Sequence, residues 1–204
     1  MRSFFVTGIG TEVGKTISSA VLVEKLKCDY WKPVQSGDLD NSDTEKVKGL
    51  ITNSISVFHS EAYRLRQPFS PHKSAELDSI RINLKNIMPP STENRLLIEG
   101  AGGLMVPLND EEFVIDLIQQ LQTEVILIVR HYLGSINHTL LSLEILHRRS
   151  IPLKGIIING RADEYSERII LKYPGVKLLG RIPELETIDK KAIVEAGNAI
   201  NELF

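Results

Sequence analysis

The segment Thr7-Gly8-Ile9-Gly10-Thr11-Glu12-Val13-Gly14-Lys15-Thr16 decides the fold. It joins the apolar run Phe4–Val6 to a stretch with helical spacing of apolar residues, the setting that a phosphate-binding loop requires. Glycines let the backbone turn tightly and direct N–H groups at phosphate oxygens, and the following helix adds the positive end of its dipole. We therefore expect Lys15 to reach the β/γ phosphates and the Thr16 hydroxyl to bind Mg²⁺.

The spacing of this loop departs from the common form. Ile9 occupies the usual position of the first glycine, and Gly8 and Gly10 flank it. A glycine-rich turn with a chance Gly-Lys-Thr is the alternative, but a strand before the loop and a helix after it disfavour that interpretation. An Asn-Lys-x-Asp motif for guanine is absent from the sequence.

Short apolar runs alternate with longer amphipathic stretches along the chain. Nearly continuous apolar runs are typical of strands buried on both faces of a parallel sheet. The expected strands are Phe4–Val6, Tyr30–Val34, Leu96–Ile98, Val125–Val129, Ile156–Ile158 and Val176–Leu179, and the expected helices are Lys15–Lys27, Phe113–Leu121, Ile136–Arg148, Glu164–Lys172 and Lys190–Leu203. This alternation predicts right-handed βαβ units in an α/β three-layer sandwich with a mainly parallel sheet, of the P-loop NTPase type.

Composition limits the class of protein. The 204 residues, 42% hydrophobic and 25% charged with a net charge of −2, predict one globular domain over residues 1–204. The near-neutral charge argues against a nucleic-acid partner, and the apolar runs are too short to cross a membrane. The single Cys28 excludes an intramolecular disulfide and a cysteine zinc site. We expect a cytoplasmic protein.

Two carboxylates and a second lysine are candidates for chemistry. Glu99 ends an apolar run and precedes Gly100–Gly103, where the carboxyl end of a parallel strand would gather ligands. Asp43 stands near a helix start, so it is either an Mg²⁺ ligand or an N-cap. Lys32 interrupts an apolar run before Pro33; from the residues alone, an edge strand with a solvent-reaching lysine is the more frequent explanation.

Taken together, these motifs resemble the dethiobiotin synthetase family. The resemblance spans most of the chain and lies in an ordered set: Phe-Val-Thr-Gly…Thr-Glu-Val-Gly-Lys-Thr at 5–16, Lys-Pro-Val…Ser-Gly at 32–37, Asn-Ser-Asp at 41–43, Ser-Pro-His at 70–72, Glu-Gly-Ala-Gly-Gly at 99–103, Leu-Gly…Ile-Asn-His at 133–138, Asn159, and Gly-x-Ile-Pro at 180–183. It implies a homodimeric enzyme that uses MgATP and CO₂ to convert 7,8-diaminononanoate to dethiobiotin through a carbamate and a mixed carbamic–phosphoric anhydride.

The resemblance also implies residue roles. Lys32 and Lys15 match catalytic positions, and Thr16, Asp43 and Glu99 match Mg²⁺-linked positions. Positions that match ATP contacts are Glu12, Val13, Gly14, Lys15, Thr16, Ile17, Asp43, Glu99, Gly100, Ala101, Gly102, Asn159, Gly160, Pro183, Glu184 and Leu185. Positions that match substrate contacts are Ser36 and, from the partner subunit in the family, Gly134, Ser135, Ile136 and Asn137.

The sequence departs from the family at several places, and two rivals share its fold. Gly10 replaces a frequent polar residue, the Gly37–Ser42 loop is short, and Gly160-Arg161 follows Asn159. A ParA/MinD-type regulatory ATPase is the main alternative; such proteins carry a lysine early in the loop, where this chain has Gly10. An amidoligase of the cobyrinic-acid type would need a glutaminase domain, for which 204 residues leave no room.

Overall fold

A parallel sheet forms the centre of the molecule. The structure, a computed structural model, describes residues 3–201. Its main sheet has seven strands in the order β4-β2-β6-β1-β7-β8-β9, and every pairing between these neighbours is parallel. The strands are β1 (Ser3–Gly8), β2 (Asp29–Trp31), β4 (Phe58–His59), β6 (Leu96–Gly103), β7 (Glu124–Val129), β8 (Leu153–Asn159) and β9 (Leu178–Ile182).

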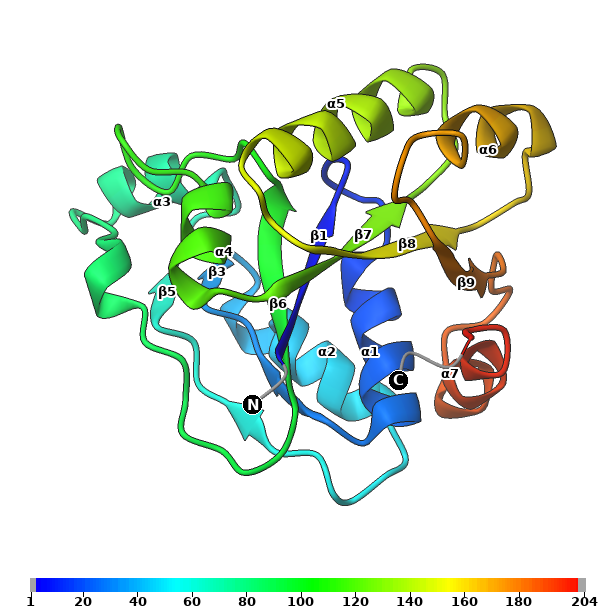
Figure 1. Cartoon of the computed structure of the whole chain (residues 1–204). Coiled ribbons are helices and arrows are strands. Elements are labelled where there is room, and N and C mark those ends of the chain that lie inside the picture. Colours follow the sequence, from blue (N-terminus) through cyan, green and yellow to red (C-terminus); the bar gives the residue numbers. More distant parts are fainter. Residues whose placement is uncertain (1–2, 202–204) are drawn as a thin grey trace.

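Helices cover both faces of this sheet, which confirms the predicted three-layer α/β sandwich (Figure 1). On one face, α1 (Lys15–Leu26) packs against α2 (Asp43–Leu50) and α7 (Lys190–Gly197). The other face carries α4 (Val114–Leu121), α5 (Ser135–Arg148) and α6 (Glu164–Ile170). The short helix α3 (Pro71–Leu77) lies beside a second, two-stranded sheet of β3 (Val34–Ser36) and β5 (Tyr63–Leu65).

The connections around β1 create a ligand-binding edge. From β1 the chain passes through α1 to β2 on one side, and β6 then leads through α4 to β7 on the other side. Strand order therefore reverses beside β1, and the loops at the carboxyl ends of β1 and β6 diverge there. In open α/β sheets this switch point is where ligands bind.

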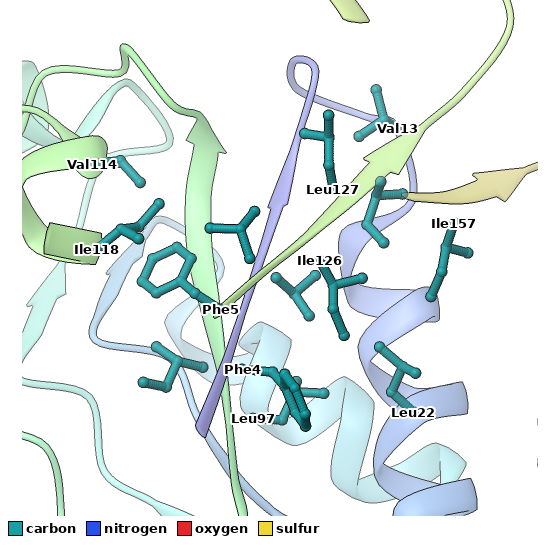
Figure 2. Close-up of a cluster of buried hydrophobic side chains, with 14 of the residues drawn as sticks. Phe4, Phe5, Val13, Leu22, Leu97, Val114, Ile118, Ile126, Leu127 and Ile157 are labelled. Atoms are coloured by element: carbon teal, nitrogen blue, oxygen red, sulfur yellow. The ribbon is translucent and has the colours of Figure 1, made fainter. Parts of the chain in front are cut away.

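The core lies on both faces of β1. Phe4, Phe5 and Val6 have at most 1% of their surface exposed, because parallel strands are covered on two sides. Figure 2 shows Phe5 beside Val114 and Ile118 of α4, whereas Leu22 belongs to α1 on the opposite face. Successive side chains of a strand point to opposite faces of the sheet. Because helices cover both faces here, every position of this run is apolar.

Three predicted segments differ from the observed ones. The predicted strand Tyr30–Val34 is split between two sheets, because Lys32 and Pro33 leave the ladder between β2 and β3. The predicted strand Val176–Leu179 is observed further along the chain, as β9 (Leu178–Ile182). The prediction ended too early because Gly180 and Arg181 interrupt the apolar pattern.

The predicted terminal helix Lys190–Leu203 is shorter than expected. It ends at Gly197, because the following residues turn back along β9: Gly180 and Ile200 form an antiparallel bridge, and the Asn201 N–H donates to the Leu179 carbonyl (2.7 Å). Leu203 itself lies outside the described residues.

Cys28, between α1 and β2, is 1% exposed, and burial raises the pKa of its thiol to about 12. Between residues 3 and 201, none of the helices combines the length and the apolar character that crossing a bilayer demands.

Candidate active site

The loop at residues 7–16, called the phosphate loop below, turns directly from β1 into α1, as predicted. Gly14 is the N-cap residue of α1 and has a φ of 88°, a left-handed conformation that glycine adopts without strain. A β-carbon at Gly14 would lie 2.0 Å from Nδ2 of Asn159, so a larger residue would displace the Asn159 side chain. The Asn159 amide donates to the Val13 carbonyl (2.9 Å) and so fixes the loop to the end of β8.

Lys15 is the first residue of α1 and is 8% exposed. Its Nζ donates to the Gly10 carbonyl at 3.1 Å, so the side chain curls back across the loop. Burial lowers the pKa of Lys15, and the nearby Glu99 carboxylate opposes this effect. The ammonium thus lies among the loop amides, where an anionic phosphate would be stabilised.

Glu99 lies inside strand β6 rather than at its end, which corrects the expected position. The strand continues through Gly103, with Val6 opposite Glu99 and a register shift before Gly8. Glu99 is fully buried, and its Oε1 accepts from Thr16 Oγ1 (3.1 Å) and Lys32 Nζ (3.2 Å). The carboxylate therefore faces the start of α1 and not open solvent.

Lys32 lies between two carboxylates. It is 5% exposed and forms ion pairs with Asp43 and Glu99. Burial alone would lower the pKa of Lys32, but the charges of Glu99 and Asp43 outweigh it and leave the pKa raised. Lys32 is therefore a buried cation, and the alternative of a lysine that reaches solvent from an edge strand is wrong.

Asp43 is the first residue of α2 and not its N-cap. Ser42 occupies the cap position, and its Oγ accepts from the Glu45 N–H at 3.3 Å. Burial alone would raise the pKa of Asp43; Lys32 and Thr16 outweigh it, so the pKa is lowered. The Asp43 carboxylate is therefore directed toward Lys32 and Thr16, and the N-cap interpretation is wrong.

A cavity of about 720 Å³ brings most of the predicted phosphate-side residues together. Its lining includes both lysines and both carboxylates of the cluster. Of the residues predicted from the sequence, Glu12, Gly14, Lys15, Thr16, Ile17, Lys32, Ser36, Asp43, Glu99, Ala101 and Gly102 line it. Val13 is buried beneath the loop, and Gly100 packs against the Phe5 ring, so these two are outside the lining.

The residues predicted for the adenine side form a neighbouring group outside this lining. The Gly160 N–H donates to the Ile182 carbonyl (2.8 Å), which joins the ends of β8 and β9. Arg161 Nε donates to Glu184 Oε2 (2.7 Å), and Leu185 packs against the core, next to Pro183 and Glu184 in sequence. Asn159 is the contact between this group and the phosphate loop.

The predicted substrate residues at 134–137 lie away from the cavity of their own chain. Gly134 is the N-cap residue of α5 at a φ of 105°, so the helix begins at Ser135, next to the predicted start at Ile136. A second groove of about 660 Å³ runs between α5 and the phosphate loop. Thr11 and Val106 line both the groove and the cavity, so the two hollows adjoin.

Sequence reasoning missed several residues of the site. The Tyr30 hydroxyl donates to Glu99 Oε2, and Gln35 Oε1 accepts from the Asp43 N–H. Residues 68–71 close one side of the cavity, and only the Ser-Pro-His motif had drawn attention to them. The aromatic and amide residues carry no motif of their own, so only the three-dimensional arrangement reveals them.

The residues at the cavity floor fit a hard divalent cation bound with a nucleotide. The Thr16 hydroxyl contacts Glu99 Oε1 and hydrogen-bonds Asp43, so three oxygen-bearing side chains converge. Mg²⁺ prefers oxygen ligands and usually takes one or two carboxylates together with phosphates and water. This donor set therefore matches Mg²⁺ better than a softer metal.

Comparison with known proteins identifies the family. Residues 2–192 match the AAA domain family. The chain is similar to "ATP-dependent dethiobiotin synthetase BioD" of Christiangramia forsetii, with 54% identity over 95% of this chain and 93% of that protein. It is also similar to the protein of the same name from Cytophaga hutchinsonii, with 48% identity over 95% of this chain and 94% of that protein.

Solved structures of P-loop ATPases share the fold. The septum site-determining protein MinD with Mg-ADP from Pyrococcus horikoshii has a TM-score of 0.62 at 15% identity, covering 96% of this chain and 86% of that one. A ParA family ATPase from Chlorobium tepidum has a TM-score of 0.56 at 15% identity, covering 98% and 99%. At 15% identity the likeness to these structures concerns the fold alone. The relatives at 54% and 48% identity indicate the family. The chain belongs to the ATP-dependent dethiobiotin synthetase family.

Proposed function

We propose that this protein is a dethiobiotin synthetase, which converts 7,8-diaminononanoate, CO₂ and ATP to dethiobiotin, ADP and phosphate. The observation that carries the proposal is the position of Lys32, a buried cation between Asp43 and Glu99 in the cavity of the phosphate loop. Its sequence relatives carry the name of this enzyme.

The chemistry requires two anions to meet. One substrate amine adds to CO₂ and loses a proton, which gives a carbamate. A carbamate oxygen attacks the γ-phosphorus and ADP leaves; the second amine then attacks the carbamoyl carbon and expels phosphate, which closes the ureido ring. Carbamate and γ-phosphate repel each other unless cations lie between them. Lys15 and Lys32 supply fixed positive charge, and positioning with electrostatics is most of what phosphoryl transfer needs.

Mg²⁺ is the cofactor that we propose, with ATP as co-substrate. Thr16, Asp43 and Glu99 would hold it, because their oxygens converge beside the phosphate loop. The ion supplies further positive charge at the phosphate oxygens when it is bound. Lys32 would then share its two carboxylates with the ion, which would leave its ammonium available to the carbamate.

The remaining roles are proposed on the same basis. ATP would contact the phosphate loop at Glu12–Ile17, strand β6 at Glu99–Gly102, and the adenine group Asn159, Gly160, Pro183, Glu184 and Leu185. Ser36, on the wall of the cavity, would contact the diamine. We propose that residues 1–204 form a single domain that carries one such site. Because the reaction consumes ATP, we place the protein in the cytoplasm.

We further propose that the enzyme acts as a homodimer. Gly134–Asn137 do not line the cavity of their own chain, whereas the groove beside α5 adjoins it. Exposed apolar side chains lie on this surface: Met105 (49% exposed) and Leu141 (60%) line the groove, and Leu133, just before α5, is fully exposed. A second copy seated there would cover this apolar surface and bring the N-terminus of its α5 to the substrate carboxylate.

An assay of phosphate release tests the function. We expect ATP hydrolysis to depend on both diaminononanoate and bicarbonate and to be matched by dethiobiotin, identified by mass spectrometry. Release that DNA or lipid vesicles stimulate, without the diamine, would instead support a regulatory ATPase. Several nucleoside triphosphates should be compared in the same assay.

A charge placed in the groove tests the dimer. We expect Leu141→Asp to convert the dimer to a monomer in sedimentation velocity and to raise the KM for diaminononanoate more than the KM for ATP. Val194→Asp, at an exposed position on α7, is the matched control and should leave both unchanged. A wild-type monomer with full activity would contradict the proposal.

A further inference from the structure

The carboxylate of Glu99 divides its two oxygens between different partners. Oε1 accepts from Thr16 Oγ1 and Lys32 Nζ, while Oε2 accepts from the Tyr30 hydroxyl at 3.0 Å. Both Glu99 and Tyr30 are 0% exposed. A buried carboxylate is costly unless its oxygens are hydrogen-bonded, and Tyr30 provides the bond on the core side.

The sheet holds Tyr30 in the position from which it reaches Glu99. Strand β2 pairs with β6 so that Tyr30 is opposite Leu97, and Glu99 lies two residues further along on the same face as Leu97. The Tyr30 ring packs against Phe58, with centroids 5.7 Å apart. The backbone N–H of Tyr30 donates to the Val57 carbonyl. The hydroxyl is therefore fixed relative to β6.

The phenol hydroxyl is the donor of the bond to Glu99, because an ionised carboxylate can only accept. Terminal carboxylate torsions are otherwise broad, so a glutamate without a partner on Oε2 can turn its plane. Partners behind a ligating carboxylate commonly set its orientation in metal sites.

We propose that Tyr30 is a positioning residue, which holds Glu99 Oε2 in the core so that Oε1 faces Thr16 and the bound metal–nucleotide. This inference rests on the proposed Mg²⁺ site and adds a residue to it. Tyr30 is fully buried and outside the lining of the cavity, so it acts through Glu99.

Tyr30→Phe tests the inference, because it removes the hydroxyl and keeps the ring. We expect the binding of Mn²⁺ to the enzyme–ADP complex, measured by electron paramagnetic resonance, to weaken about 10-fold. The Mg²⁺ concentration for half-maximal turnover should rise with it, while the KM for diaminononanoate stays the same. Binding of ADP in EDTA should also be unchanged, which shows that the nucleotide site is folded.

Tyr63→Phe is the matched control. Tyr63 lies in β5, and among the described residues its hydroxyl hydrogen-bonds the backbone of Asn83 alone. Unchanged Mn²⁺ affinity in Tyr30→Phe, or an equal loss in Tyr63→Phe, would overturn the inference.

A double-mutant cycle with Glu99→Gln adds an independent criterion. If Tyr30 acts through Glu99, Tyr30→Phe costs no further Mn²⁺ affinity in the Glu99→Gln background; independent, additive losses would overturn the inference. These measurements need no turnover. A wild type that binds Mn²⁺ and ADP but makes no dethiobiotin would therefore remove the proposed function and still test Tyr30.

Discussion

Lys32 has a raised pKa although it is buried, because two carboxylates lie against it. With Lys15 it balances the charges of Asp43 and Glu99, so the described cluster has two cations and two anions before any ligand binds. A divalent metal would bring positive charge and the phosphates negative charge, so both kinds of charge would enter the cluster together. Ligand binding can therefore replace ion pairs within the cluster by ion pairs with the metal and the phosphates.

Replacing Lys32 tests its part in turnover. We expect Lys32→Ala to fold and to lose about 10²–10³ in kcat, the size of one preorganised charge-stabilising contact. The control Lys191→Ala removes a lysine whose one ion pair within residues 3–201 is with Glu195 on α7, and it should keep wild-type turnover. Near-wild-type kcat in Lys32→Ala would contradict the role.

Asp43 and Ser42 are adjacent residues with separable effects. Asp43→Ala should weaken the Mg²⁺ dependence of turnover, because the carboxylate faces Thr16 and Lys32. Ser42→Ala should leave the Mg²⁺ dependence unchanged and reduce the free energy of unfolding by about 1 kcal/mol, since it removes the cap of α2. Mg²⁺ titrations and urea unfolding of both variants distinguish the two effects.

At the residue scale, the sequence predicted what a motif encodes. Lys15 and Thr16 follow from the loop pattern, because backbone geometry places them beside any phosphate that the loop binds. Lys32 and Asp43 were ambiguous from their spacing, and only the resemblance to a family pointed to them. Tyr30 could not be predicted, since its role depends on the pairing of β2 with β6.

Among the elements, the phosphate loop depends on one glycine. We expect Gly14→Ala to lower the free energy of unfolding by about 2 kcal/mol or more, because alanine is strained at this φ and its β-carbon would collide with the Asn159 amide. ATP affinity should fall as well, since the loop must shift.

Gly49→Ala is the matched control for this prediction. Gly49 is inside α2, where a β-carbon would meet open space. Alanine there should raise the free energy of unfolding by roughly 0.5–1 kcal/mol. Urea unfolding of both variants checks the opposite signs, and two changes of the same sign would contradict this account of the loop.

The long periodic elements were predictable and the short ones were not. Strands β1, β6, β7 and β8 each contain a continuous apolar run, and the apolar residues of α5 recur every three and four residues. Strands β4 and β5 have two and three residues, too few for a pattern. Pairing with β2 and β3 holds them in place, and that pairing is a tertiary effect.

For the whole molecule, we expect stability to fall in acid. Burial alone would raise the pKa of Asp29, but Thr92, the Val57 N–H and Asn94 donate to it and leave the pKa lowered. A lowered folded-state pKa stabilises the protein above the unfolded value, near 3.9, and this contribution is lost as pH falls through the folded value. Asp43 adds an effect of the same sign.

Urea unfolding from pH 7 to pH 2.5, followed by the fluorescence of buried Trp31, measures this dependence. The free energy of unfolding should decrease below about pH 5. Asp29→Asn should be less stable than wild type at pH 7 by about 2 kcal/mol, and the difference should shrink in acid. A constant difference across this range would show that the charge of Asp29 is not the cause.

The burial of Cys28 has a practical consequence. The chain contains no second cysteine, and a thiol that is 1% exposed with a pKa of about 12 supplies almost no thiolate to react with a maleimide. A cysteine introduced at an exposed position such as Leu133 would therefore accept a spin label selectively, and Cys28 would not have to be replaced. In the proposed homodimer, two such labels, one per subunit, would make the spacing between the α5 helices a distance that can be measured in solution.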